Sequence, residues 1–210
     1  MADGPRERVP TLRGRQTQAA IDVAARTVVA RKGILATTVS DIAAEADRST
    51  ASFYNYYDSK EAMVREWALR FLDEVRDRAQ SAVKPELSDR DRIYEITAAH
   101  WHTYRNRLAE IISVQQMAMV SDDFARYWSD ICALSISLMT AIVRRAQRQG
   151  FNTEDDSELV AIAMVSMFNQ FCYSQLSGTD TDAALDDEAH ITTLANAFYR
   201  TIYHKETGPT

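Results

Sequence analysis

Hydroxyl, phenol and amide side chains crowd one short stretch of this 210-residue chain, at Ser49, Thr50, Ser52, Asn55 and Tyr56. Such groups offer hydrogen-bond donors and acceptors without a net charge. They suit the phosphate oxygens of DNA as well as the edges of its bases. A capped helical hairpin that simply exposes its serines would have the same composition, so the stretch alone leaves both interpretations open.

Two short helices are predicted to position these side chains. Thr38 followed by Asp41 is typical of a capping box, which predicts a helix over about residues 39–46. Ser49 is a second good N-cap, and it predicts another helix over about residues 50–56. Helices joined by so tight a turn must cross closely, which requires a small residue at the crossing.

The residues between the two helices meet that requirement. Ala43 is the small residue at mid-length, and Ile42, Ala46 and Phe53 lie at spacings that turn them toward the partner helix. The polar residues then face outward. The spacing therefore favours a two-helix unit that presents one hydrogen-bonding surface.

The stretch from Thr38 to Glu61 resembles the N-terminal helix-turn-helix of the TetR family of transcriptional regulators. The resemblance rests on Thr38, Ile42, Ala43, Ala46, Ser49, Tyr54, Tyr56, Ser59, Lys60 and Glu61. Two residues depart from the family pattern. Asp47 replaces the glycine of the turn, and aspartate is one of the few other residues that tolerates a left-handed backbone. Arg48 replaces an apolar residue, which indicates either a looser turn or a phosphate contact.

The resemblance implies roles for individual side chains on a double-stranded DNA operator. Residues at positions near base edges are Ser40, Thr50, Ala51, Ser52 and Tyr54. Residues at positions near phosphates are Thr38, Ser49, Tyr56 and Lys60, with Arg48 as a further candidate.

Composition agrees with a helical, DNA-binding chain. Six glycines and four prolines provide few breaks, which favours long helices over a many-turned sheet. The net charge of -6 is unusual for a nucleic-acid binder, but residues 1–60 hold nine Lys and Arg against seven Asp and Glu. The positive charge is thus gathered where DNA would be approached.

Three regions are predicted along the chain. Residues 1–13 form a mobile basic arm that reaches a neighbouring minor groove, or else a plain disordered tail. Residues 14–60 form the helix-turn-helix DNA-binding domain, whose first helix ends at Gly33. Residues 61–210 form a helical-bundle domain for ligand binding and dimerisation.

The predicted fold is all-α throughout, because no stretch alternates like a strand. The helix after Lys60 runs toward Ala82 and links the DNA-binding domain to the rest as a stiff lever. Further helices are expected over about 88–108, 109–120 and 122–149, then from a cap at Thr153 to 176, and over 186–204.

Two of these helices indicate a partner. Residues 159–173 are apolar nearly all round, and the last helix carries a second wide apolar stripe. The family resemblance implies that these helices form a homodimer through a four-helix bundle, although a purely internal core helix would show the same pattern. The interface residues expected are Leu159, Ile162, Met167, Ile191, Leu194, Phe198 and Ile202.

The resemblance also implies an inducer pocket in the helical-bundle domain. The candidate lining residues are Trp67, Phe71, Thr97, His100, Trp101, Tyr104, Met117, Trp128, Ser135, Phe168 and Phe171. Asn169 and Cys172 are additional polar candidates. Most such aromatic residues are ordinary core in any helical protein. The few polar groups indicate a mostly apolar ligand, aromatic or acyl.

Other kinds of chemistry are not expected. His100 and His102 point to different faces of one helix, and no third ligand completes a metal site. An enzyme would need converging titratable groups, and only His100 is suggestive. No cofactor is expected. The start of the chain is unlike a signal peptide, and the apolar run of residues 159–173 is shorter than the roughly 20 residues of a membrane span. We expect a cytoplasmic protein with no membrane partner.

These observations predict a ligand-responsive transcriptional regulator. The expected form is a repressor that leaves a palindromic operator when a small, mostly apolar molecule binds the C-terminal domain. The alternative is a constitutive helical DNA-binding protein with no small-molecule effector.

Overall fold

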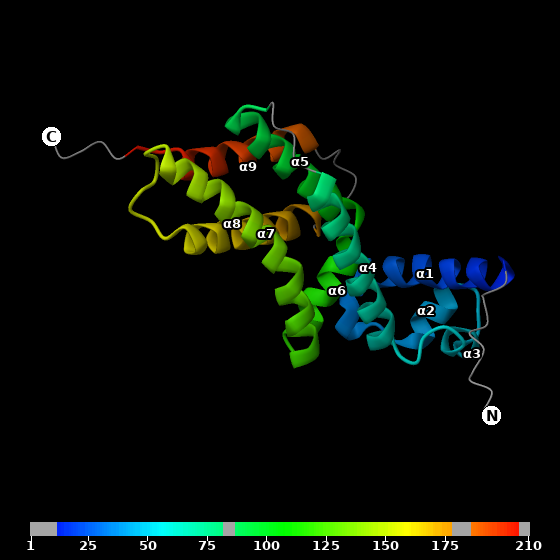
Figure 1. The fold of residues 1–210 in the computed structure, drawn as a ribbon. Coiled ribbons are helices and arrows are strands. Elements are labelled where there is room, and N and C mark those ends of the chain that lie inside the picture. Colours follow the sequence, from blue (N-terminus) through cyan, green and yellow to red (C-terminus); the bar gives the residue numbers. More distant parts are fainter. Residues whose placement is uncertain (1–11, 82–86, 178–185, 206–210) are drawn as a thin grey trace, which may run out of the picture.

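The structure is a computed structural model that describes residues 12–81, 87–177 and 186–205 (Figure 1). Within these ranges the regular elements are all α-helices. Their bounds are α1 (Leu12–Ala36), α2 (Val39–Glu45), α3 (Thr50–Tyr54), α4 (Lys60–Ser81), α5 (Asp89–Asn106), α6 (Leu108–Ala118), α7 (Asp122–Arg148), α8 (Ser157–Leu176) and α9 (Asp187–Ile202).

The first helix is interrupted where the sequence predicted its end. Gly33 has φ 73° and ψ 160°, a backbone conformation that breaks α1 and leaves a last turn up to Ala36. The helix begins at Leu12, earlier than expected, so residues 12 and 13 are not part of an arm. The remainder of the predicted arm, residues 1–11, lies outside the described residues.

Local capping explains most of the other helix boundaries. The side chain of Thr38 accepts a hydrogen bond from the Asp41 amide in a complete capping box, as predicted. Ser49 and Ser88 likewise cap α3 and α5. The expected cap at Thr153 is wrong. Asp156 caps α8 instead, because its Oδ1 accepts from two amides of the first turn at 2.9 Å each.

The helices separate into a head and a body. The head consists of α1, α2 and α3 and lies at one end of the molecule, whereas α5, α8 and α9 lie toward the other end (Figure 1). Helices α4, α6 and α7 occupy the middle. Helix α6 packs on α1 and on α7, and α4 packs on α6 and α7, so the head is braced by two helices of the body.

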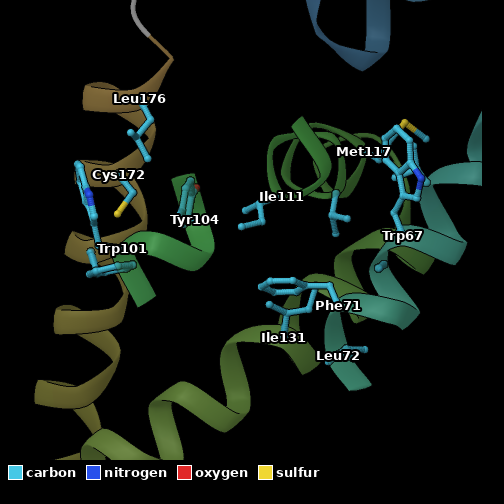
Figure 2. Packing of buried hydrophobic residues seen from close by; sticks show 14 of the residues in the cluster. Trp67, Phe71, Leu72, Trp101, Tyr104, Ile111, Met117, Ile131, Cys172 and Leu176 are labelled. Atoms are coloured by element: carbon cyan, nitrogen blue, oxygen red, sulfur yellow. The ribbon is translucent and has the colours of Figure 1, made fainter. Parts of the chain in front are cut away.

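One cluster of buried hydrophobic residues extends from α1 to α9. Trp67 of α4 lies beside Met117 of α6, and Phe71 lies beside Ile131 of α7 (Figure 2). Trp67 is only 2% exposed although it joins head and body. The head therefore rests on the same core as the helices behind it, and the predicted domain boundary near residue 60 stays a prediction.

Candidate DNA-binding surface and ligand cavity

The side chains of α2 and α3 are arranged as the sequence predicted. Ile42, Ala43 and Phe53 are buried between the helices. The candidate residues that are exposed to solvent are Thr38, Ser40, Arg48, Ser49, Thr50, Ala51 and Tyr54. Ser52 and Tyr56 are only half-buried rather than fully outward, and Tyr56 packs against the core. The head thus presents one continuous polar surface on a rigid apolar base.

The turn between α2 and α3 is tightly closed. Asp47 has φ 51°, the left-handed conformation for which the family uses glycine. The amide of Asp47 donates to the Ala44 carbonyl at 3.1 Å, and the amide of Arg48 donates to the Ala43 carbonyl at 2.9 Å. These two bonds are those of a Schellman motif, so the looser turn considered from the sequence is not present. The Arg48 side chain is left at the surface beside the start of α3.

Replacing Asp47 by glycine is expected to stabilise the protein by about 0.5–1 kcal/mol, because glycine adopts the left-handed conformation without a Cβ penalty. Urea unfolding of the two proteins would measure the difference. Asp47→Ala is the control. Alanine keeps the Cβ penalty of the left-handed conformation and lacks the local hydrogen bonding that lets aspartate tolerate it, so this variant should have a lower free energy of unfolding. A glycine variant that is less stable than the parent would contradict this account of the turn.

Lys60, which the sequence assigned to a phosphate contact, has intramolecular partners in the structure. Its Nζ lies 3.0 Å from the Ile34 carbonyl oxygen, 3.4 Å from that of Leu35 and 2.8 Å from that of Thr37. An ammonium group has three protons, and these three carbonyls accept all of them. Lys60 therefore closes the C-terminal end of α1 and holds α4 beside it.

Ion pairs fix α2 on α1. Arg31 pairs with Glu45 at 2.5 Å, and Lys32 pairs with Asp41 at 2.6 Å. Hydrogen bonds from Lys32 and Thr38 hold the pKa of Asp41 well below its usual range. Asp41 therefore stays ionised at neutral pH while it takes part in the capping box of α2.

A buried carboxylate that the sequence analysis did not identify joins the head to α4. Asp22 is 6% exposed and accepts hydrogen bonds from Tyr57 at 2.7 Å and from the Trp67 indole at 3.4 Å. Arg70 lies 3.5 Å from its other oxygen. Burial, together with the hydrogen bond to Asp22, raises the pKa of Tyr57 to about 12. The position of Asp22 inside the apolar stripe of α1 was the feature of the sequence that could have indicated this buried carboxylate.

A second buried carboxylate joins the head to α6. Glu110 is 3% exposed, and its Oε1 lies 2.7 Å from Arg26 of α1. Arg107 lies 3.1 Å from Glu110 and also pairs with Glu74 of α4. In the sequence of α6, Glu110 is flanked by apolar residues, and this pattern could have indicated a buried carboxylate.

The end of α6 also contacts the break in α1. The side-chain oxygen of Gln116 accepts a hydrogen bond from the backbone amide of Ile34 at 3.0 Å. A Cβ at Gly33 would lie 2.9 Å from the same oxygen. Glycine is favoured at residue 33 by its φ angle, and a Cβ there would in addition make the Gln116 side chain shift away from Ile34.

A small cavity lies among α5, α7, α8 and α9. Its volume is about 50 Å³, and its lining residues are Ile96, Thr97, His100, Ser135, Leu138, Met139, Ile142, Met164, Val165, Phe168, Asn169 and Phe198. Pockets that hold small ligands typically measure roughly 300–1,000 Å³. The cavity as it stands would have to widen to hold more than a very small molecule.

Only part of the predicted ligand set reaches this cavity. Thr97, His100, Ser135 and Phe168 line it, and so does Asn169. The predicted residues that do not line it are Trp67, Phe71, Trp101, Tyr104, Met117, Trp128 and Phe171, which are core or pack against the core.

Trp101 and Tyr104 have structural partners of their own. The Trp101 indole donates to Asp187 at 2.9 Å and stacks on His190, while the Tyr104 hydroxyl bonds Gln115 at 3.2 Å. Both side chains join neighbouring helices. Most of the missed lining residues are aliphatic or methionine, and a sequence does not distinguish these from core.

Three of the seven residues predicted for the dimer interface are exposed on α8. Leu159 is 66% exposed, Ile162 38% and Met167 43%, and their spacing places them on one side of the helix. The four α9 residues that were predicted to lie in the dimer interface are instead buried inside the protomer. Ile191, Leu194, Phe198 and Ile202 are each at most 3% exposed within one protomer, where α9 packs on α5.

Helix α8 is also longer than the apolar run suggested. Among the described residues, it alone is long and apolar enough to cross a membrane by length and composition, with 28% of that stretch buried. The sequence analysis judged residues 159–173 too short to span a membrane, but the whole helix α8, with 20 residues, is long enough. A helix covered by a second protomer would have the same composition.

Comparison with known proteins identifies the head. The family model described as bacterial regulatory proteins, tetR family, matches residues 21–67. The HTH-type transcriptional repressor KstR2 of Rhodococcus jostii is 31% identical over 131 residues, which cover 56% of this chain and 63% of that repressor. The match thus spans less than two thirds of that relative.

Solved structures show the same all-helical fold over nearly the whole chain. The ketosteroid regulator KstR2 of Mycobacterium tuberculosis has a TM-score of 0.72 at 20% identity, covering 94% of this chain and 98% of its own. The regulator FadR from Bacillus subtilis, in complex with stearoyl-CoA, has a TM-score of 0.66 at 15% identity, covering 89% and 100%.

The predicted fold class is confirmed by these structures and by the helices described above. The relatives are named as regulators, in agreement with the expectation that this chain is not an enzyme. The helix-turn-helix resemblance read from residues 38–61 falls within the matched segment. Residues 21–67 of the chain thus match the tetR family of bacterial regulatory proteins.

Proposed function

We propose that this chain is a DNA-binding transcriptional regulator that reads its operator with α3. The main supporting observation is the exposed surface of Ser49, Thr50, Ala51 and Tyr54, which is held on a buried apolar base. Side-chain hydroxyls at these positions are suited to base edges in the major groove. The excess of basic residues in the first 60 residues would assist the approach to phosphates.

A homodimer completes the proposal. Leu159, Ile162 and Met167 leave a large apolar surface on α8 that a second protomer would cover by two-fold symmetry. Helix α9 would join this interface with its outer face, which carries Thr193, Arg200 and Thr201, and not with its buried stripe. Two heads related by a two-fold axis fit a palindromic operator whose half-sites lie about 34–36 Å apart or a multiple of that distance.

Selection from random double-stranded DNA would test the proposal directly. The purified protein is expected to enrich a palindromic sequence, and fluorescence anisotropy should then show tighter binding to that palindrome than to scrambled DNA. The ratio of these affinities is expected to be about a thousandfold or more at physiological salt. Equal affinity for selected and scrambled DNA would contradict sequence-specific regulation.

Arg48 and Lys60 form a matched pair that tests the geometry of the head. Arg48→Ala is expected to weaken binding to all sequences and to reduce the slope of log affinity against log salt by about one, if its exposed guanidinium meets a phosphate. Lys60→Ala should leave that slope unchanged, because its ammonium is bound to three carbonyls. It should instead lower the melting temperature.

The measurement is anisotropy with the selected operator over a range of salt concentrations, combined with thermal unfolding of each variant. An unchanged slope for Arg48→Ala would remove Arg48 from the proposed contact surface. A reduced slope for Lys60→Ala would restore the phosphate role that the sequence suggested.

The proposed regulator is a repressor released by a small, mostly apolar ligand in the cavity between α5, α7, α8 and α9. The apolar lining supports this class of ligand, and so does the stearoyl-CoA bound by the Bacillus subtilis regulator. Ligand and DNA would each favour a different spacing of the two heads, so each would weaken the other by the same factor. If no ligand that occupies the cavity changes operator affinity, the protein is instead a constitutive DNA binder.

A further inference from the structure

One end of the cavity carries a polar pair, His100 of α5 and Ser135 of α7. The Nδ1 atom of His100 lies 2.9 Å from the Ile96 carbonyl oxygen. A carbonyl can only accept, so Nδ1 carries the ring proton. In the neutral ring Nε2 is then an acceptor, and it lies 3.3 Å from the Ser135 hydroxyl.

The other two polar lining residues each have one donor engaged elsewhere. The Thr97 hydroxyl donates to the Ile93 carbonyl at 2.7 Å. The amide of Asn169 donates to the sulfur of Cys132 at 3.7 Å. The cavity lining includes no Lys, Arg, Asp or Glu. An ionic ligand group placed there would lose its hydration without gaining a permanent opposite charge.

We infer that this cavity binds a neutral, apolar alcohol or phenol. The ligand hydroxyl donates to Nε2 of His100, while the Ser135 hydroxyl turns away from Nε2 and donates to the ligand oxygen. A ketone or an ether can accept from Ser135 but cannot donate to Nε2, so only a hydroxyl uses both members of the pair. This inference deepens the ligand-binding part of the proposed function and does not depend on DNA binding.

The lining also shows which side chains make room. Met139 and Met164 border the cavity, and their flexible thioether chains adapt to irregular shapes. Leu138 is 39% exposed and lies at the rim, where it can move toward solvent. The hydroxyl is thus held at a fixed polar end while the apolar part of the ligand displaces adaptable side chains.

The test uses the full-length protein, labelled with ¹³C at its methionine methyl groups, and four probes of matched shape. These are 4-propylphenol, 4-propylanisole, propylbenzene and 4-propylbenzoate. Titrations followed by NMR are expected to shift the Met139 and Met164 methyl signals. The phenol should bind about tenfold more tightly than the anisole, since only the phenol can both donate to Nε2 and accept from Ser135. The benzoate should bind most weakly.

Ser135→Ala and His100→Phe test the assigned pair. Each is expected to bring the affinities for phenol and anisole to within about twofold, with thermal unfolding used to confirm that both variants fold. If His100→Phe fails to fold, Ser135→Ala alone decides the outcome.

The inference is overturned if the phenol has no advantage in the parent protein, if the benzoate binds best, or if no probe shifts the Met139 and Met164 signals. A protein that keeps the preference for phenol but binds no operator would overturn the proposed function and leave the cavity assignment intact.

Discussion

Two arginines on the exposed face of α8, introduced as Ile162→Arg with Met167→Arg, are expected to lower operator affinity by about 100- to 10,000-fold. Both positions face outward in one protomer. In an interface formed by two-fold symmetry, both new charges of each protomer would be buried in an apolar contact. The monomer that results has one head, and it loses the gain in affinity that two linked binding units provide.

Analytical ultracentrifugation would follow the change from dimer to monomer, and anisotropy would compare a palindrome with a half-site. The matched control is Met119→Arg with Val120→Arg, because these residues are 82% and 66% exposed at the turn between α6 and α7. The control should remain a dimer with parental affinity. A dimeric α8 variant with unchanged operator affinity would show that this face is not the interface.

Truncation of Glu110 to alanine is expected to lower the free energy of unfolding by about 2–3 kcal/mol. Loss of one partner of a buried ion pair costs about 3–5 kcal/mol, and we reduce that figure because the side chains of Arg26 and Arg107 are 35% and 31% exposed. Glu110→Gln keeps the shape and some hydrogen bonds, so we expect a loss of about half that size.

Urea unfolding would measure these losses, and a double-mutant cycle with Arg26→Ala would separate the pair from the other contacts of α6. Asp123→Ala serves as the surface control. Asp123 pairs with Arg126, but both side chains are about two thirds exposed, so its loss should cost less than about 0.5 kcal/mol. A Glu110→Ala protein as stable as this control would show that the buried carboxylate contributes little.

The parts of the fold that depend on neighbouring residues were predicted well. Thr38, Ser49 and Ser88 cap the helices as expected, and Gly33 and Gly150 both have the positive φ that ends a helix. Each of these features is decided within a few residues of chain. Asp47 tolerates a left-handed backbone and adopts one, although the sequence left a looser turn open.

The parts that depend on distant contacts were not predictable. The stripe of α9 was assigned to a dimer interface, because the sequence does not show that α5 of the same protomer covers it. Lys60 was assigned to a phosphate because its contacts, the carbonyls of residues 34, 35 and 37, are arranged only by the fold. The cavity lining was mostly missed because an aliphatic side chain beside a cavity has the same sequence signature as one in the core.

The contact between Gln116 and the break in α1 has a consequence for protein engineering. Gly33 and Ile34 belong to the head, yet the side chain that bonds the Ile34 amide comes from α6, about 80 residues later. A chimera that joins these head residues to another regulator would place an unmatched residue against Gly33 and leave that amide without its acceptor. A graft of DNA specificity onto this scaffold therefore has to treat residue 116 as part of the transplanted unit.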